Sequence, residues 1–287
     1  MKLLQSKLFV DSQVTELQNI IDDFGLSPKL AIIVAKGYSK ASERYVRNKH
    51  KLAERIGVEI VTHEVEWEGL ESEEFENNLK ILIDKLNNDN TIHGIIVQLP
   101  VPYISDDLIS TLIVPHKDVD GFHPYNLGEL VRGNQFFTSC TPKAIYELMN
   151  YNKIDVCGKK VCIINRSNIV GKPLANLLIN KDATVTVCHS KTSKQDLDMF
   201  IRQSDIVITG VGIQNFLCND NFSDNTIIID VSINFDEHGK LCGDVKKEDY
   251  DKLVSRGCMI TPVPGGIGPC TVLSLMSNVV KACYILT

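Results

Sequence analysis

The sequence predicts an α/β protein with two units, each a parallel sheet with helices packed against it. Short β-branched runs alternate with helical patterns along almost the whole chain, which is typical of βαβ units. The 287 residues, 44% hydrophobic and 23% charged, are enough for two domains of ~100–200 residues each. A turn-rich stretch without periodicity at residues 121–142 divides the strands and helices into two sets.

The first set consists of buried apolar runs separated by segments with helical spacing. The runs predict strands at residues 30–35, 58–65 and 94–99, and the spacing predicts helices at 41–56 and 72–86. Ser105 is a suitable N-cap for a further short helix.

The second set begins after Gly158 and repeats the alternation. It predicts strands at residues 160–164, 184–188, 205–209 and 226–231, and helices at 172–179 and 194–202. A final helix at 271–284 is expected to return to the first domain. The predicted domains are therefore residues 1–140 plus 266–287, and residues 141–265.

Charge and terminal sequences exclude several classes of protein. The formal net charge of -6 argues against a nucleic-acid partner, because phosphate neutralisation needs a basic face. The N-terminal MKLLQSKLFVDSQ has no apolar core long enough for a signal peptide. Polar residues interrupt the apolar C-terminal run, so we expect no membrane span and a cytoplasmic location.

Cysteines and histidines indicate no metal centre. The nine cysteines stand singly in apolar stretches, which is typical of reduced, buried thiols. No CxxC pair occurs, and the seven histidines lack the spacing of metal ligands. The sequence therefore predicts that no metal is bound.

The run TPVPGGIGP at residues 261–269 has three prolines and three glycines in nine residues. Proline locks one dihedral, whereas glycine opens conformations closed to other residues and allows a ligand to approach the main chain. The run fits either the wall of a ligand site or a tight structural loop between a strand and the last helix.

The segment KKVCIINRSNIVGKPLANLL predicts a strand, a turn and a helix that begins at Gly171, with Pro173 in its first turn. Free N–H groups and the helix dipole favour a phosphate at such a helix N-terminus. The G-x-G-x-x-G pattern is not met, because Asn165 and Ser167 stand where its first two glycines would be. Asparagine tolerates left-handed backbone, so the turn remains feasible.

Cofactor choice is usually decided at the end of the following strand, which here reads CHSKT and lacks a carboxylate. Ser190 can donate a hydrogen bond and Arg166 can neutralise charge, which favours NADP over NAD. Alternatively, Arg166 is a solvated loop cation.

Polar residues of the first unit fall at positions suited to a ligand. Tyr45 and Lys49 are four residues apart and share one face of a predicted helix. Gln98 ends a buried strand, and ligands of α/β sheets bind outside such ends. Asp118 and Asp120 lie in a tight loop. Each also has a structural explanation: an amphipathic surface pair, a strand-end hydrogen bonder and turn formers.

Nine motifs together occur in the order and spacing of one family over residues 30–285: YVRNK, GIIVQLPVP, PHKDVDGFHP, CTPKA, NRSNIVGKP, TVTVCHSKT, DVSIN, GDV and TPVPGGIGPCT. The chain resembles the bifunctional methylenetetrahydrofolate dehydrogenase and methenyltetrahydrofolate cyclohydrolase family. The resemblance implies two α/β domains with a cleft between them, the second a Rossmann-type NADP domain, and a homodimer. It also implies oxidation of 5,10-methylenetetrahydrofolate by NADP and hydrolysis of the methenyl product to 10-formyltetrahydrofolate, without a metal. These reactions belong to one-carbon metabolism, tetrahydrofolate interconversion and purine biosynthesis.

The resemblance assigns roles to individual residues. Lys49 matches the catalytic lysine, Tyr45 the tyrosine beside the folate ring, Gln98 the glutamine that tunes the lysine and Asp120 the carboxylate that holds the pterin. A lysine beside a cationic substrate should have a pKa lowered towards ~7–8, and could then accept a proton from the attacking water. The remaining matches are Leu99, Pro262, Gly265 and Gly266 beside the folate, and Asn165, Arg166, Ser167, Ser190, Ile233 and Thr141 beside NADP. The Leu99-Pro100 and Val263-Pro264 bonds are expected to be cis.

The chain departs from the family pattern at two positions on the cofactor side, Asn165 and Ser232, where the family has glycine. Side chains there are expected to weaken NADP binding or alter cofactor preference. The N-terminus also lacks the family's usual opening segment. Three alternatives remain: a dehydrogenase without hydrolase activity, which Lys49 argues against; a non-catalytic folate or dinucleotide binding protein; and a dehydrogenase of another small acid on a similar scaffold.

Overall fold

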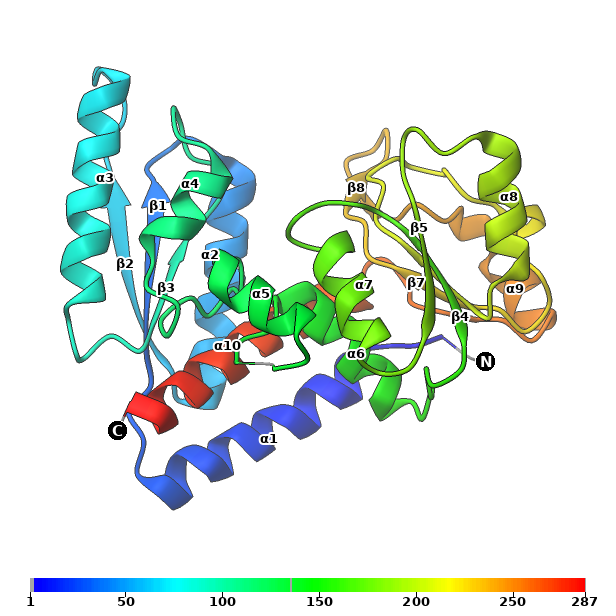
Figure 1. Ribbon diagram of the computed structural model, residues 1–287, viewed down its shortest axis with the longest axis horizontal. Coiled ribbons are helices and arrows are strands. Elements are labelled where there is room, and N and C mark those ends of the chain that lie inside the picture. The colour runs from blue at the N-terminus through cyan, green and yellow to red at the C-terminus, as the bar shows by residue number, and fades with distance from the viewer. Residues whose placement is uncertain (1–2, 135, 287) are drawn as a thin grey trace. The chain divides into compact units, whose positions relative to one another are not determined.

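The computed structural model describes residues 3–134 and 136–286, which form two compact units (Figure 1). The three-stranded unit comprises Ser12–Glu129, Gln135–Cys140 and Val272–Thr287, and the five-stranded unit comprises Met1–Asp11, Leu130–Asn134 and Thr141–Thr271. The contact-based division places Met1–Asp11 with the five-stranded unit, whereas the boundaries predicted from the sequence place them with the first domain. The reason is that Leu4 N donates to Ile260 O at 2.8 Å and Ser6 N to Gly265 O at 2.9 Å.

The three-stranded unit contains an entirely parallel sheet. Its strands β1 (Lys29–Ala35), β2 (Glu59–Val65) and β3 (Gly94–Val97) lie in the order β2-β1-β3. Helix α2 (Lys40–Ile56) connects β1 to β2, and α3 (Ser72–Asn87) connects β2 to β3. The chain therefore leaves β1 in one direction and returns to its other side. Sheets of this kind bind ligands where the order reverses, so we refer to the carboxyl ends of β1 and β3 as the crevice of this unit.

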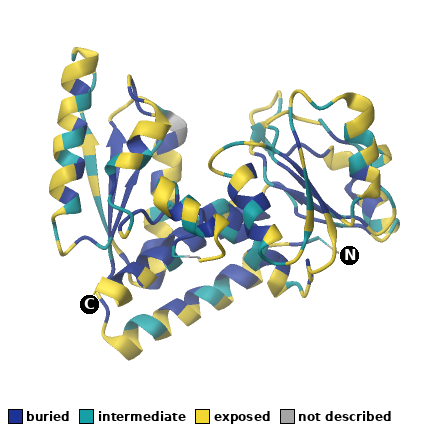
Figure 2. Cartoon of the chain, viewed as in Figure 1, coloured by how far each residue is buried: buried dark blue, intermediate teal, exposed yellow. Residues whose placement is uncertain are grey.

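Apolar residues from the strands and helices form the core of this unit. Residues of β1 and β3 pack against α3 and α4 (Asp106–Leu112), and all have little or no exposed surface: Ala31, Ile33, Phe75, Leu79, Ile83, Ile95 and Ile109. Ser39 and Ser105 cap α2 and α4, as side chains that accept from Ser42 N and Leu108 N. The cap predicted at Ser105 is thereby confirmed. Figure 2 shows β1 and β3 buried and the outer side of α3 exposed.

The five-stranded unit also contains a parallel sheet, in the order β10-β7-β6-β4-β5. The strands are β4 (Lys160–Ile164), β5 (Thr184–Cys188), β6 (Ile206–Thr209), β7 (Ile227–Asp230) and β10 (Met259–Ile260). Helices α7 (Gly171–Ile179) and α8 (Lys194–Gln203) follow β4 and β5, and α9 (Tyr250–Ser255) precedes β10. The strand order reverses between β4 and β6, so the second crevice lies at their carboxyl ends.

The predicted strands and helices all occur, with end shifts of a few residues, but several elements were missed. These are α1 (Lys7–Phe24), α5 (Pro124–Val131), α6 (Cys140–Tyr151), the short helices η1 (Asn219–Asn221) and η2 (Lys247–Asp249), α9, β10 and the hairpin β8 (Asn234–Phe235) with β9 (Leu241–Cys242). The stretch at 121–142 is thus not only a crossing, because it contains α5 and the start of α6. The helix α5 was missed because its sequence contains proline and glycine, which are typical of turns.

The last helix, α10 (Ile267–Leu286), begins four residues before the predicted start. Pro269 falls in its first turn, where a missing N–H costs least. Among the described residues, α10 alone is long and apolar enough to cross a membrane by length and composition. However, 56% of the apolar stretch is buried inside the protein, and a core helix passes the same test.

Candidate active site and dinucleotide site

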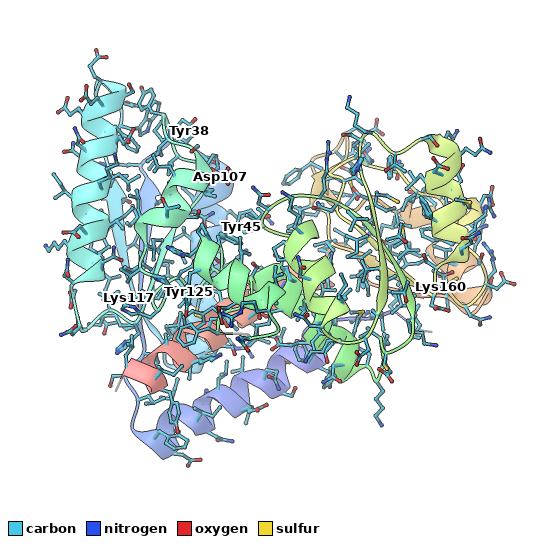
Figure 3. All side chains as sticks on the ribbon, in the orientation of Figure 1. Tyr38, Tyr45, Asp107, Lys117, Tyr125 and Lys160 are labelled. Carbon is cyan, nitrogen blue, oxygen red and sulfur yellow. The ribbon has the colours of Figure 1, made fainter. Side chains whose placement is uncertain are left out.

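Lys49 and Gln98 form a direct hydrogen bond at the crevice of the three-stranded sheet. Helix α2 presents Tyr45 and Lys49 on one face, and Lys49 Nζ donates to Gln98 Oε1 at 2.7 Å. Gln98 directly follows β3, and its Nε2 donates to Leu99 O at 3.1 Å. The amide is therefore oriented with its oxygen towards the lysine. Figure 3 labels Tyr45, whose side chain is 38% exposed, on the same helix.

Asp120 lies close enough to Lys49 for each charge to affect the other's protonation. Burial lowers the pKa of Lys49, while the charge of Asp120 and then that of Cys140 oppose the shift. Burial raises the pKa of Asp120, and Lys49 opposes that shift. Both side chains keep some exposed surface. Both residues are thus closely surrounded by protein without being fully covered.

The loop that carries Asp120 is fixed by its own polar contacts. The buried Asp118 carboxylate accepts from Phe122 N at 3.2 Å, from His123 N at 2.8 Å and from Asn126 Nδ2 at 2.8 Å. Gly121 has φ +73°, and a Cβ there would lie 2.7 Å from Ser139 N. These contacts fix the backbone position of Asp120.

Two residues that the sequence did not single out hold this loop from the other side. Asn278 Nδ2 donates to Val119 O at 2.8 Å and to Thr138 O at 3.2 Å. Cys140 Sγ donates to Val119 O at 3.3 Å, and a hydrogen bond with Cys140 lowers the pKa of Asp120. A buried asparagine in an apolar helix is the signal that could have revealed Asn278, because a buried amide needs partners.

The TPVPGG segment belongs to the five-stranded unit and folds tightly on itself. Both expected cis bonds are present, at Leu99-Pro100 and Val263-Pro264. Gly265 has φ +106°, and a Cβ at Gly266 would lie 2.7 Å from Pro262 O. Ser6 Oγ donates to Gly265 O at 2.8 Å. Glycine is thus required at both positions.

The turn between β4 and α7 is organised by the Asn165 side chain. Its Oδ1 accepts from Ser167 N at 2.8 Å and from Gly171 N at 3.1 Å. Its Nδ2 donates to Gly210 O at 2.6 Å, in the loop that follows β6. A Cβ at Gly171 would lie 2.1 Å from Asn165 O, so only glycine fits there. Asn165 therefore links the two strand ends that flank the crevice.

A buried carboxylate supports the loop after β6. Asp244 accepts from Val211 N at 2.7 Å, from Gly212 N at 3.1 Å and from Ile213 N at 3.0 Å. It also accepts from Thr209 Oγ1 at 2.7 Å and from Asn234 Nδ2 at 3.2 Å. The neighbouring Asp230 accepts from Ser232 N and Val245 N, and burial raises its pKa to about 7.

The remaining predicted cofactor residues are compatible with a dinucleotide. Arg166, Ser190 and Ile233 are exposed and follow the carboxyl ends of β4, β5 and β7. Within residues 3–134 and 136–286, Arg166 has no ion-pair partner, so its charge is available to an anion. Thr141 Oγ1 lies 3.4 Å from Thr271 Oγ1. A cation, a hydroxyl and an apolar side chain along one sheet edge fit a phosphorylated nucleotide with an aromatic end.

The predicted site residues thus fall into two groups. Tyr45, Lys49, Gln98, Leu99 and Asp120 lie in the three-stranded unit. Pro262, Gly265, Gly266, Thr141, Asn165, Arg166, Ser167, Ser190 and Ile233 lie in the five-stranded unit. Among the described residues, no group of three or more histidines, cysteines or carboxylates is arranged to hold a metal ion.

Two parallel α/β units, one with a lysine–amide pair and one with a nucleotide crevice, define a dinucleotide-dependent enzyme of the two-domain class. Family models identify it further. The catalytic-domain model of tetrahydrofolate dehydrogenase/cyclohydrolase matches residues 4–120, and the NAD(P)-binding-domain model matches residues 139–286. The chain therefore belongs to the tetrahydrofolate dehydrogenase/cyclohydrolase family.

Individual relatives agree with this assignment. The bifunctional protein FolD of Ligilactobacillus salivarius is 43% identical over 273 residues, which are 95% of this chain and 92% of that protein. The bifunctional FolD methylenetetrahydrofolate dehydrogenase/cyclohydrolase of Campylobacter jejuni is 40% identical, with a TM-score of 0.91 over 99% of both chains. The Trypanosoma brucei enzyme, solved with NADP cofactor and inhibitor, is 32% identical, with a TM-score of 0.87 over 99% of this chain and 97% of that one.

Proposed function

We propose that this chain is a bifunctional enzyme that oxidises 5,10-methylenetetrahydrofolate with NADP and hydrolyses the methenyl product to 10-formyltetrahydrofolate. The observation that carries the proposal is the Lys49–Gln98 pair at 2.7 Å beside Asp120, in a chain that belongs to this family. An amine with a lowered pKa is what the hydrolytic step needs.

Lys49 is the general base of hydrolysis. Water attacks the methenyl carbon, a C–O bond forms, and a water proton passes to the neutral Nζ of Lys49. The bond from that carbon to one folate nitrogen then breaks as the C=O bond of the formyl group forms. The proton held by Lys49 passes to this nitrogen, and the remaining hydroxyl proton is released to water. Gln98 Oε1 keeps Nζ oriented by accepting a hydrogen bond from it, and the bond from Gln98 Nε2 to Leu99 O holds the amide in this orientation.

Asp120 positions the substrate. Its carboxylate accepts hydrogen bonds from the pterin N–H groups, and the fixed loop around it gives the pterin one orientation. Tyr45 lies against the folate ring. Leu99, Pro262, Gly265 and Gly266 border the folate with backbone and small side chains.

The dinucleotide residues bind and orient NADP, which accepts a hydride from the one-carbon bridge when it is bound. Arg166 and Ser190 hold the 2′-phosphate, the first by charge and the second by a hydrogen bond. Asn165, Ser167, Thr141 and Ile233 lie along the rest of the cofactor. The exposed Arg166 at the end of β4 supports the choice of NADP over NAD.

The proposal also includes the organisation of the protein. We assign folate binding to a catalytic domain of residues 1–140 plus 266–287, and NADP binding to a Rossmann-type domain of residues 141–265. The enzyme acts in the cytoplasm as a homodimer and provides 10-formyltetrahydrofolate for purine biosynthesis. The resemblance to the family supports these statements, and size-exclusion chromatography with light scattering measures the oligomeric state.

A cofactor comparison tests the activity. The purified protein is mixed with 5,10-methylenetetrahydrofolate and either NADP or NAD, and the reduced cofactor, methenyl and formyl products are followed. We expect reduced cofactor and 10-formyl product with NADP. Methenyl accumulation without hydrolysis would leave a dehydrogenase only. If no product forms with NADP or with NAD, but the protein still binds folate or dinucleotide, it is a non-catalytic binding protein.

A further inference from the structure

Both positions at which the chain departs from the family's glycines contact one loop. We define the β6 loop as Gly210–Ile213, the four residues that follow β6. Asn165 reaches it from the end of β4, and Ser232 reaches it from the end of β7. Since β4 and β7 flank β6 in the sheet, the two side chains approach the loop from opposite sides.

On the β4 side, the Asn165 amide makes three hydrogen bonds to main chain. Its Nδ2 donates to Gly210 O at 2.6 Å, and its Oδ1 accepts from Ser167 N and Gly171 N. A Cβ at Gly210 would lie 3.2 Å from Asn165 Nδ2, closer than most side-chain contacts. The glycine at 210 thus leaves the space that the asparagine occupies.

On the β7 side, the Ser232 hydroxyl accepts from Gly212 N at 3.1 Å, and Ser232 is only 7% exposed. Gly212 has φ +78°, a conformation that glycine adopts readily. Gly212 N also donates to Asp244 Oδ1 at 3.1 Å. The hydroxyl therefore adds a second acceptor to an N–H group that Asp244 already binds.

We propose that Asn165 and Ser232 brace the β6 loop from two sides and hold it in the conformation that binds NADP. This inference rests on the proposed function of the dinucleotide site. The β6 loop lies at the crevice between β4 and β6, where sheets of this order bind their ligands. The added side chains point at neighbouring backbone, which reverses the expectation that they obstruct the cofactor.

The brace acts through preorganisation. A loop that is ordered before binding loses less conformational freedom when the ligand arrives, so more of the interaction energy appears as affinity. With alanine at both positions, the loop would keep its hydrogen bonds to Asp244. It would lose the bond from Asn165 to Gly210 O and the bond from Gly212 N to Ser232.

Alanine is used in place of the family's glycine because alanine removes the side-chain hydrogen bonds without the added backbone freedom of glycine. Asn165→Ala, Ser232→Ala and the double variant are compared with two matched controls in the same unit. In Asn176→Ala the lost amide donates to Lys172 O, and in Ser204→Ala the lost hydroxyl donates to Phe200 O. Calorimetry measures the NADP dissociation constant, and hydrogen exchange measures amide protection of residues 209–214 without cofactor.

We expect each brace variant to bind NADP about three- to tenfold more weakly, as for a lost hydrogen bond, with faster exchange in the β6 loop. The double variant should lose less than the product of the two single losses, since one broken side already frees the loop. The controls should match the unaltered protein. Equal or tighter NADP binding by either single variant, or strictly multiplicative losses, would overturn the brace. If the unaltered protein binds no NADP, the proposed function fails, and loop exchange still tests the brace.

Discussion

The two sheets share one topological device but place different chemistry in it. In the three-stranded unit, the crevice between β1 and β3 holds an amine and an amide in direct contact, and burial displaces the pKa of Lys49 and Asp120. In the five-stranded unit, the crevice between β4 and β6 is bridged by a neutral amide that contacts backbone. The first arrangement suits proton transfer, whereas the second suits ligand binding.

The two units show that buried polar groups have two different uses in this protein. Asp244 and Asp230 are buried deeply and engaged with backbone N–H groups, so they support loops. Lys49 and Asp120 keep some exposed surface, and Lys49 contacts a single side-chain amide. Polar groups that are fully satisfied by the protein organise a site, and partly exposed ones with displaced pKa are available to a substrate.

The largest expected effect is on the amine. Lys49→Met should lower hydrolysis of methenyltetrahydrofolate by about 10²–10⁴-fold, the usual contribution of a general base. Folate binding, followed by fluorescence or calorimetry, should stay within a few-fold because Tyr45 and Asp120 remain. Lys51→Met, an exposed position on the same helix, is the matched control. Unchanged hydrolysis in Lys49→Met would refute the assigned role.

The second effect tests whether charge at the β4 end selects the cofactor. Arg166→Gln should weaken NADP binding by about 10- to 100-fold, because a charge-assisted hydrogen bond to phosphate is lost. Affinity for NAD should hardly change. Lys172→Gln removes an exposed cation that donates to Asn168 Oδ1, and serves as control. Equal losses for NAD and NADP would mean that Arg166 does not contact the 2′-phosphate.

A smaller effect is expected at the support of the Asp120 loop. Asn278→Leu leaves Val119 O and Thr138 O without that donor, which should cost about 1–3 kcal/mol of unfolding free energy. Displacement of Asp120 should also lower hydrolysis about tenfold. Val279→Ala, a buried neighbour on α10, should reduce the melting temperature but preserve hydrolysis. Comparable rates in both variants would make Asn278 a structural residue only.

The smallest effect concerns pH. Hydrolysis requires neutral Lys49, so its rate should rise with pH and reach half its maximum below the free lysine value of 10.5, because burial lowers the pKa of Lys49. Gln98→Glu places a carboxylate against the ammonium and should raise this midpoint by about one unit. At neutral pH the variant should then be slower than the unaltered protein, and the difference should disappear in alkali. Gln203→Glu, exposed on α8, should leave the profile unaltered.

Much of the fold was accessible from local pattern, because buried parallel strands such as β1 and β4 are, after their first lysine, uninterrupted apolar runs rich in isoleucine and valine. The spacing of Tyr45 and Lys49 placed both on one face of α2. In contrast, α5 was missed because Pro124 and Gly128 resemble turn residues when helix packing is unknown. Local patterns say little about short helices whose stability comes from tertiary contacts.

The sites show the same division. Resemblance located Lys49, Gln98 and Asp120. The partners of Asn278, however, lie 159 and 140 positions away and could not be inferred from its own helix. At Asn165, the sequence indicates an added side chain but not its direction. The structure shows that the amide donates to Gly210 O, and this contact is the basis for our proposal that Asn165 supports NADP binding.

The distribution of thiols has a practical consequence. Of the nine cysteines, only Cys157 is exposed, whereas Cys162 and Cys188 are buried with their sulfur atoms 3.8 Å apart, and burial raises the pKa of both. Thiolate is the reactive form, so a maleimide dye at neutral pH should label Cys157 first. The natural chain thus offers a position for a fluorescent reporter in the five-stranded unit without any engineered cysteine.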